Sequence, residues 1–204
     1  GDLGISKAGG ATISSLIGER LLNTFELGGI VAIIAVPLSI ILGLIAAMYP
    51  GTIIDRVVTF GTLSLISVPE FFIATFLVLI IAVELQWLPS IAYMSGDETG
   101  WDWLKAMAMP IATLVIVVAA QMIRMTRAGI LNVMSSPYIE MAILKGVPRK
   151  RIILRHALFN AIGPIVNVIA LNLAYLVSGV VIVETIFAYP GLAKLMVDGV
   201  QTRD

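Results

Sequence analysis

Four long apolar runs constrain the fold of this chain more than any other feature. They lie at about residues 27–49, 57–83, 106–123 and 161–183, and only the second contains a charged residue, Glu70. A helix of about 23 residues is roughly 35 Å long, enough to cross a hydrocarbon core of about 30 Å. Backbone groups in lipid must be satisfied within the segment, which favours helices. The sequence therefore predicts an all-α, polytopic membrane helix bundle with four spans in a single transmembrane domain over residues 1–204.

Composition supports this class and excludes several others. The chain is 59% hydrophobic and 13% charged, where a soluble domain has about 25% charged residues. Lysine plus arginine equals aspartate plus glutamate at 13 each, so no nucleic-acid partner is indicated. With no cysteine, one histidine and no phosphate-binding, HExxH or GxSxG motif, we expect no catalytic residues, no metal site and no cofactor bound by this chain.

The basic residues predict how the chain crosses the membrane. On one side of the four spans lie Arg56, Arg124, Arg127, Lys145, Arg149, Lys150, Arg151 and Arg155, and on the other lie Lys7, Arg20, Lys105, Lys194 and Arg203. The positive-inside rule places the first group in the cytoplasm. Both ends, and the tryptophan-rich segment 84–105, are then external in a multi-pass plasma membrane protein. Because no signal peptide precedes an external start, we expect a further helix before residue 1.

The basic loop, residues 132–156, has a pattern beyond its charge. Ile139, Ala142, Ile143 and Gly146 are spaced to share one face of a short helix. Gly146 suits the left-handed residue that ends a helix, and Pro148 suits the first turn of the next. We predict a helix, a tight turn and a second helix that continues into the last span. A simpler alternative is that these charges only fix orientation and contact anionic lipid headgroups.

Two carboxylates lie near or within the apolar runs. Glu70 follows Pro69 inside the second run, and Glu184 follows the fourth. Carboxylates at such depth are costly and often functional, so both are candidates for the substrate path. For Glu70 the alternative is a side chain satisfied at an interface where Pro69 interrupts the helix. For Glu184 a structural role is favoured over a binding one.

The segment EMAILKG, followed by RKRIILRHALFNAIGPIV, resembles the EAA loop of binding-protein-dependent ABC importer permeases, in the form typical of the dipeptide/oligopeptide/nickel group. GDLGIS near the start and VETIFAYPGLAKLMVDGVQTRD at the end extend the resemblance over nearly the whole chain. Met141 stands where that family commonly has alanine. The resemblance implies a type I importer permease and a chain that lacks the family's first and last transmembrane helices.

The resemblance also implies the partners and their contacts. The 138–156 loop would form coupling helices that sit in a groove of an ATP-binding cassette subunit, which alone binds ATP and magnesium. The residues implied to couple are Glu140, Ala142, Gly146, Arg149 and Arg151. Further expected partners are a second permease subunit, identical or homologous, an extracytoplasmic solute-binding protein, and membrane lipid. The expected cargo is a dipeptide or oligopeptide, with nickel or another solute as alternatives.

Two other classes of protein fit parts of the pattern. A secondary transporter with a proton relay through Glu70 would need paired ionisable groups within the spans and internal symmetry, but the sequence shows one clear intramembrane acid and no repeat. A membrane scaffold that docks a soluble protein on its basic loop would have the same periodicity.

Overall fold

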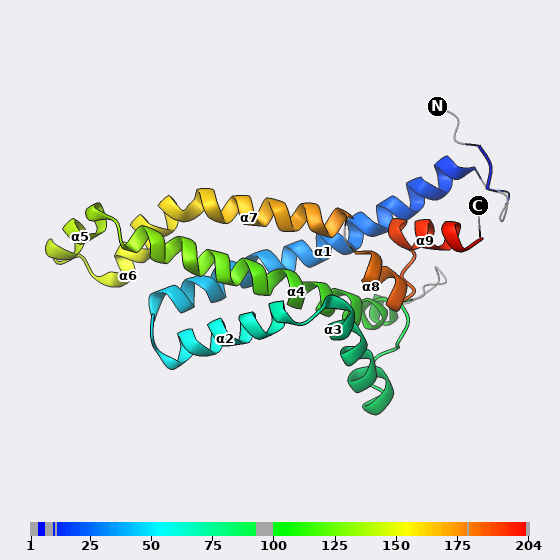
Figure 1. The fold of residues 1–204 in the computed structure, drawn as a ribbon, viewed down its shortest axis with the longest axis horizontal. Helices are drawn as coiled ribbons and strands as arrows, with labels where there is room; N and C mark the ends of the chain where they lie inside the picture. Colours follow the sequence, from blue (N-terminus) through cyan, green and yellow to red (C-terminus); the bar gives the residue numbers. More distant parts are fainter. Residues whose placement is uncertain (1–3, 7–9, 11, 93–99, 179, 203–204) are drawn as a thin grey trace. The chain divides into compact units, whose positions relative to one another are not determined.

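The computed structural model describes residues 4–6, 10, 12–92, 100–178 and 180–202. Within these residues the chain is helical, with one isolated bridge between Ile5 and Thr12 and no strand, so the all-α prediction is confirmed. The α-helices are α1 (Ile13–Met48), α2 (Ile53–Ser67), α3 (Glu70–Leu77), α4 (Gly100–Met134), α5 (Pro137–Leu144), α6 (Arg149–Ile152), α7 (Leu158–Ser178), α8 (Val181–Ile186) and α9 (Leu192–Thr202) (Figure 1). Two π-helical segments, Val78–Glu84 and Ile153–Ala157, continue α3 and α6.

Three of the four predicted spans fall within one helical stretch each, and the second falls on a broken pair of helices. α1, α4 and the helical stretch Arg149–Ile186 are each long and apolar enough to cross a membrane, and α2 with α3 and its π-helical continuation makes a fourth span if the broken pair is counted as one. The break between α2 and α3 falls at Val68 and Pro69. Pro69 is the proline at which the sequence predicts an interruption of the second apolar run. Residue 179 of the last stretch, and Lys7, Arg203 and residues 93–99, lie outside the described residues.

The helices are longer than the predicted spans. α1 begins at Ile13, well before the apolar run at residues 27–49. α4 begins at Gly100, inside the tryptophan-rich segment, and runs past Arg124 and Arg127 to Met134. Charged residues end a lipid-facing run, but lysine, arginine and glutamate are good helix formers. The helices therefore continue beyond the apolar runs.

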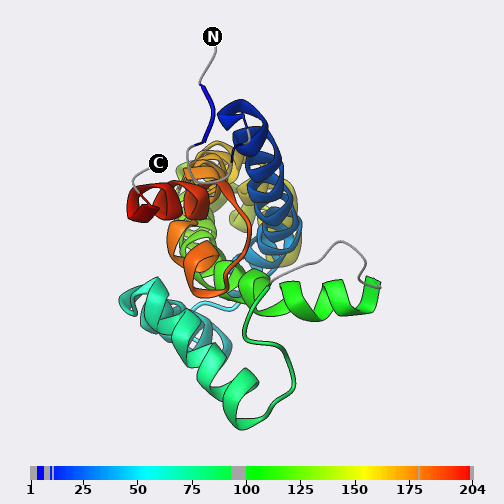
Figure 2. The same ribbon diagram turned by 90° about the vertical axis from the view of Figure 1, so that its right-hand side faces the viewer.

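The chain forms two compact units. One contains residues 1–32, 69–115 and 174–204, and the other contains residues 33–68 and 116–173. In the first unit, α8 packs against α9 and α3 (Figure 2). In the second, α1, α4 and α7 meet in a core whose buried members are Ala47, Ile130, Ile153, Ala157, Ala161 and Ile165.

Small residues let the helices of the second unit approach closely. A Cβ atom built on Gly43 of α1 would lie 2.7 Å from the Cβ atom of Thr126 on α4. Ser39, one turn earlier, donates to its own helix at Ala35 O (2.6 Å) and lies 3.4 Å from Ala119 O on α4. Such small-residue contacts are typical of helix pairs in membranes.

An ion pair that sequence reasoning missed joins α2 to α4. Asp55 is 4% exposed in the first turn of α2. Its carboxylate accepts two hydrogen bonds from Arg127, from Nε at 2.5 Å and from Nη2 at 2.9 Å, and a third from the Gly51 amide at 2.8 Å. This bidentate geometry is the strongest form of such a pair.

Removing the carboxylate should destabilise the second unit. We expect Asp55→Ala to lower the free energy of unfolding by about 2 kcal/mol, because Arg127 and the Gly51 amide lose a charged acceptor. Thermal unfolding of the purified protein in detergent measures the change. Arg56→Ala, an exposed neighbour, is the matched control and should leave the melting temperature almost unchanged. Equal melting temperatures for Asp55→Ala and the control would contradict this role.

Candidate functional site

The predicted helix–turn–helix is present as α5 and α6, which pack side by side where the chain turns back after α4 (Figure 1). Gly146 ends α5 with φ +74, in the left-handed region. The Gly146 amide donates to Ile143 O (2.9 Å) and the Val147 amide donates to Ala142 O (3.1 Å). These two bonds form a Schellman motif, so the predicted role of Gly146 as the helix-ending residue is confirmed.

Pro148 lies one position earlier than predicted. It is the extended residue that precedes α6, and its carbonyl accepts hydrogen bonds from the amides of Arg151 (2.9 Å) and Ile152 (3.2 Å). The second helix continues without interruption through the π-helical segment into α7, as expected.

Most of the large apolar residues of α5 are exposed. Ile139 in the first turn is fully buried, whereas Ile143 is 54% exposed and Leu144 is 80% exposed. Ile139, Ala142 and Ile143 lie on the predicted helix, and Gly146 lies just beyond its end. Burial is confined to Ile139 and, in part, Ala142, so Ile143 is left open to a partner.

All five residues implied to couple are on this hairpin. Glu140, Gly146, Arg149 and Arg151 are exposed, and Ala142 is half-buried. No atom lies within 4 Å of a Cβ atom built on Gly146, so the turn leaves room for a partner's backbone. Among the described residues, no ion pair involves Glu140 or either arginine. The hairpin can therefore offer both apolar and charged contacts to another protein.

Glu184 is fully buried, and its carboxylate lies at the N-terminus of α9. Its Oε1 accepts from the Thr24 hydroxyl at 2.7 Å, and its Oε2 accepts from the Lys194 amide at 3.0 Å. The Thr24 hydroxyl oxygen in turn accepts from the Leu192 amide at 2.9 Å. Together Thr24 of α1 and Glu184 satisfy amides that the first turn of a helix leaves without partners. This geometry favours the structural alternative for Glu184, and substrate contact stays a prediction.

The turn after α8 is fixed to α1 by two further hydrogen bonds. The Tyr189 hydroxyl donates to Asn23 O (2.8 Å), and Asn23 Nδ2 donates to Pro190 O (2.8 Å). Burial raises the pKa of Tyr189 above its usual value, so the phenol stays a neutral donor. The sequence indicated only a turn at Tyr189, Pro190 and Gly191. Its bonds to α1 span more than 160 residues, which local pattern cannot reveal.

Glu70 is the first residue of α3, and its Oε2 accepts a hydrogen bond from the hydroxyl of Tyr175 on α7. Its Oε1 is buried and has no hydrogen-bond partner among the described residues. The expectation that Glu70 is satisfied at an interface is thus met for one oxygen. A buried oxygen without a partner leaves capacity for a cation or a donor from outside the chain.

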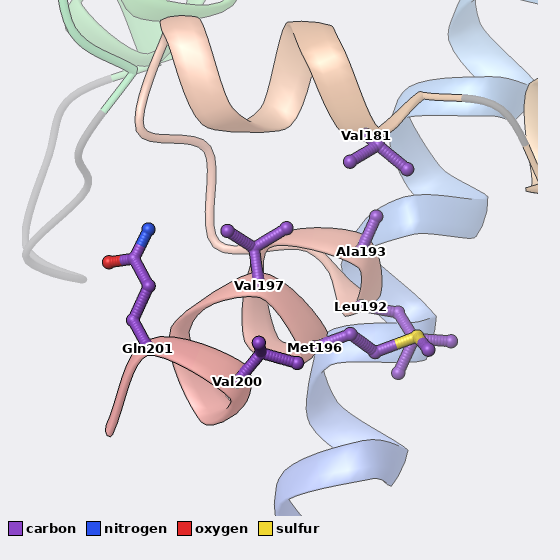
Figure 3. Close-up of a pocket in the computed structure, with 7 residues that line it drawn as sticks. All are labelled: Val181, Leu192, Ala193, Met196, Val197, Val200 and Gln201. Atoms are coloured by element: carbon purple, nitrogen blue, oxygen red, sulfur yellow. The ribbon is translucent and has the colours of Figure 1, made fainter. Parts of the chain in front are cut away.

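α9 has a strongly apolar side with a hollow beside it (Figure 3). Figure 3 shows Val181 of α8 across from Ala193, Met196 and Val200 of α9, with polar Gln201 also in the lining. Met196 is 66% exposed and Val200 is 80% exposed. Lys194 and Asp198, on the polar side of α9, form an ion pair at 3.1 Å.

These features define a multi-pass α-helical membrane protein with an exposed helical hairpin, and the described residues hold no cluster of histidine and acidic residues suited to a metal. Residues 39–204 match the model of the family described as "Binding-protein-dependent transport system inner membrane component". The chain belongs to this family, so the resemblance noted from the EMAILKG segment is confirmed. The prediction of a multi-pass protein of the inner membrane is confirmed as well.

Curated relatives align along the whole chain. It is 34% identical over 205 residues to the probable peptide ABC transporter permease protein y4tP of Sinorhizobium fredii, covering 100% of this chain and 65% of that protein. It is 34% identical over 203 residues to a putative peptide transport system permease protein of Brucella abortus (100% and 65%). It is 35% identical over 204 residues to the glutathione transport system permease protein GsiC of Shigella flexneri (100% and 64%). The chain thus spans about 65% of the length of these relatives.

Proposed function

We propose that this chain is the membrane-spanning permease part of an ATP-driven importer of dipeptides or oligopeptides. The single observation that carries the proposal is the α5–α6 hairpin. In this hairpin a left-handed Gly146 ends α5, and Ile143 and Leu144 are exposed. The hairpin lies within the part of the chain that matches the family model. An ATP-binding cassette subunit would bind there and would hold the ATP and magnesium, while this chain binds no cofactor and catalyses no reaction.

The coupling residues would then divide into two groups. Ala142 and Gly146 allow a close backbone approach, and the exposed last turn of α5 supplies apolar contact. Glu140 would orient the hairpin through a polar contact, with Arg149 and Arg151 beside it on α6. Exposed Ile143 and Leu144 next to the exposed charges of α6 would suit a docked protein, and we propose this role over a purely topological one.

The helices on either side of the hairpin suggest how movement would be transmitted. α4 ends three residues before α5, and α6 continues into α7 without a break. When nucleotide closes the ATPase pair, the hairpin would shift as a rigid body and carry these helices between inward-open and outward-open arrangements. The hairpin would lie in the cytoplasm, and both ends of the described chain would lie outside. A second permease subunit and an external solute-binding protein would complete the importer.

Peptides are the favoured cargo because the relatives that match along the whole chain carry peptide or glutathione transport in their names. A nickel complex or another solute is the alternative within the same family. A secondary transporter with a proton relay through Glu70 is disfavoured. Such a relay needs a second acidic side chain, and the buried carboxylate of Glu184 already accepts hydrogen bonds from Thr24 and the Lys194 amide.

Reconstitution tests the proposed function. The permease, its ATPase, the second permease and the binding protein are placed in proteoliposomes, and uptake of a labelled dipeptide is followed. We expect uptake that needs ATP and the binding protein and that persists when an ionophore collapses the proton gradient. Uptake that follows the proton gradient without ATP would support the secondary transporter instead.

Glu70 offers a narrower test of the substrate path. If its free oxygen receives the ammonium group of a peptide, Glu70→Gln should raise the KM for peptide uptake by about tenfold to thirtyfold, the loss of one charged hydrogen bond. An N-acetylated peptide, which has no ammonium group, should be unaffected by the substitution. Tyr175→Phe removes only the hydroxyl group that donates a hydrogen bond to Glu70. This variant is the control for local disturbance of the structure. Equal uptake of the free peptide by wild type and Glu70→Gln would remove Glu70 from the substrate path.

A further inference from the structure

A basic hollow opens at the start of the last membrane helix. It is lined by Pro148, Lys150, Arg151, Leu154 and Arg155. We call this set the basic hollow. Its three cationic side chains are exposed. Within the described part of the chain, no carboxylate lines the basic hollow and none of the three cations forms an ion pair.

The opposite side of the same helical stretch is committed to the protein core. Ile152 is 1% exposed, and Ile153 and Ala157 are fully buried, with Ile153 and Ala157 in the core cluster that joins α1, α4 and α7. The helix therefore cannot turn the basic hollow inward. Its three positive charges face outward and are open to an anion from outside this chain.

The position of the basic hollow along the helix indicates what balances it. Arg155 lies two residues before the uncharged run that begins at Ala157. Lys150 lies five residues before Arg155, about 7.5 Å along the axis at 1.5 Å per residue. A hydrocarbon core that begins at this run would place the three cations at the depth of lipid headgroups, and half-buried Leu154 would offer an apolar contact to an acyl chain. Basic pockets at this depth attract anionic headgroups.

We propose that the basic hollow binds the phosphate headgroup of an anionic membrane lipid. Arg151 also belongs to the predicted coupling set, whereas Lys150 and Arg155 do not. The inference rests on the membrane placement of the family and not on docking of an ATPase, so each can fail without the other.

The test uses the purified importer in a neutral detergent, titrated with phosphatidylglycerol or phosphatidylcholine, with bound lipid measured by native mass spectrometry. The variant Lys150→Gln/Arg155→Gln removes two cations from the basic hollow. We expect its affinity for phosphatidylglycerol to fall about 30-fold, with phosphatidylcholine binding unchanged, since each basic residue near a charged surface contributes about 1 kcal/mol. The matched control Arg56→Gln/Arg124→Gln removes two other exposed cations from the same predicted side and should bind phosphatidylglycerol like wild type.

Three results would overturn the proposal. One is equal phosphatidylglycerol affinity in the hollow variant and wild type. Another is displacement of phosphatidylglycerol by millimolar inorganic phosphate, which would show a site for a soluble anion. The last is a hollow variant that loses the ATPase subunit but keeps the lipid, which would assign the basic hollow to the ATPase interface. Copurification of the ATPase with every variant separates this last result from failure of the importer itself.

Discussion

Replacing Gly146 with valine should reduce ATP-driven uptake by at least about tenfold while leaving membrane insertion intact. The residue has φ +74, a conformation that costs a residue with a side chain about 1–2 kcal/mol, and more for a β-branched one. Valine would open the Schellman motif that fixes α6 against α5. It would also place a branched side chain on the surface where a partner's backbone is expected. Uptake and ATP hydrolysis are measured together in proteoliposomes.

A second substitution separates conformation from space. Asparagine tolerates the left-handed region better than other residues with a Cβ atom, so Gly146→Asn should keep the hairpin closed. If it restores most of the uptake, backbone conformation is the cause. If it is as inactive as valine, close approach of the partner is the cause. Gly163→Ala, in open space on α7, is the control and should transport normally. Normal uptake by Gly146→Val would sink the role assigned to this turn.

Replacing Gly191 with alanine should cause the largest loss of stability of any single substitution considered. A Cβ atom at this position would overlap the carboxylate of Glu184. That carboxylate has little freedom to move, because it is fully buried and is bonded to Thr24 and to the Lys194 amide. We expect a cost of about 3 kcal/mol or more, from overpacking combined with a broken buried network. Thermal unfolding in detergent and the amount of protein in the membrane both report it.

Two further variants identify the cause. Gly29→Ala, where the added methyl group meets no atom within 4 Å, should be neutral or slightly stabilising, since alanine favours a helix. Glu184→Ala combined with Gly191→Ala should unfold at a higher temperature than Gly191→Ala alone, because the overlapping carboxylate is gone. A Gly191→Ala protein as stable as wild type would contradict the packing described around Glu184.

Sequence reasoning predicted the presence of the helices better than their ends. The apolar runs mark where lipid is tolerated, so they identify α1, α4 and α7, but a helix continues wherever its residues remain good helix formers. This is why α4 continues past Arg124 and Arg127 to Met134. The break before Glu70 was visible, because Pro69 lacks an amide hydrogen and restricts the residue before it.

The candidate site was predictable where its chemistry is local. Gly146 could be placed because a left-handed turn of this kind favours glycine, whatever surrounds it. The side-chain bonds from Thr24 to Glu184, Arg127 to Asp55 and Tyr175 to Glu70 could not, because each joins residues at least 72 positions apart in the chain. For Glu184 the sequence has one local indication of a buried position, the Tyr-Pro-Gly turn that follows it within a few residues. Spacing alone could not identify Thr24 as its partner.

The central claim is that the α5–α6 hairpin is where this chain meets an ATPase subunit. The chain has no cysteine, so a single one can carry a photoactivated cross-linker in the intact importer. Leu144→Cys, at a position 80% exposed at the end of α5, should cross-link to the ATPase subunit. Trp87→Cys, at a position 71% exposed in the segment predicted to be external, should not. Cross-linking of the ATPase through residue 87, or none through residue 144 in an importer that hydrolyses ATP, would contradict the account.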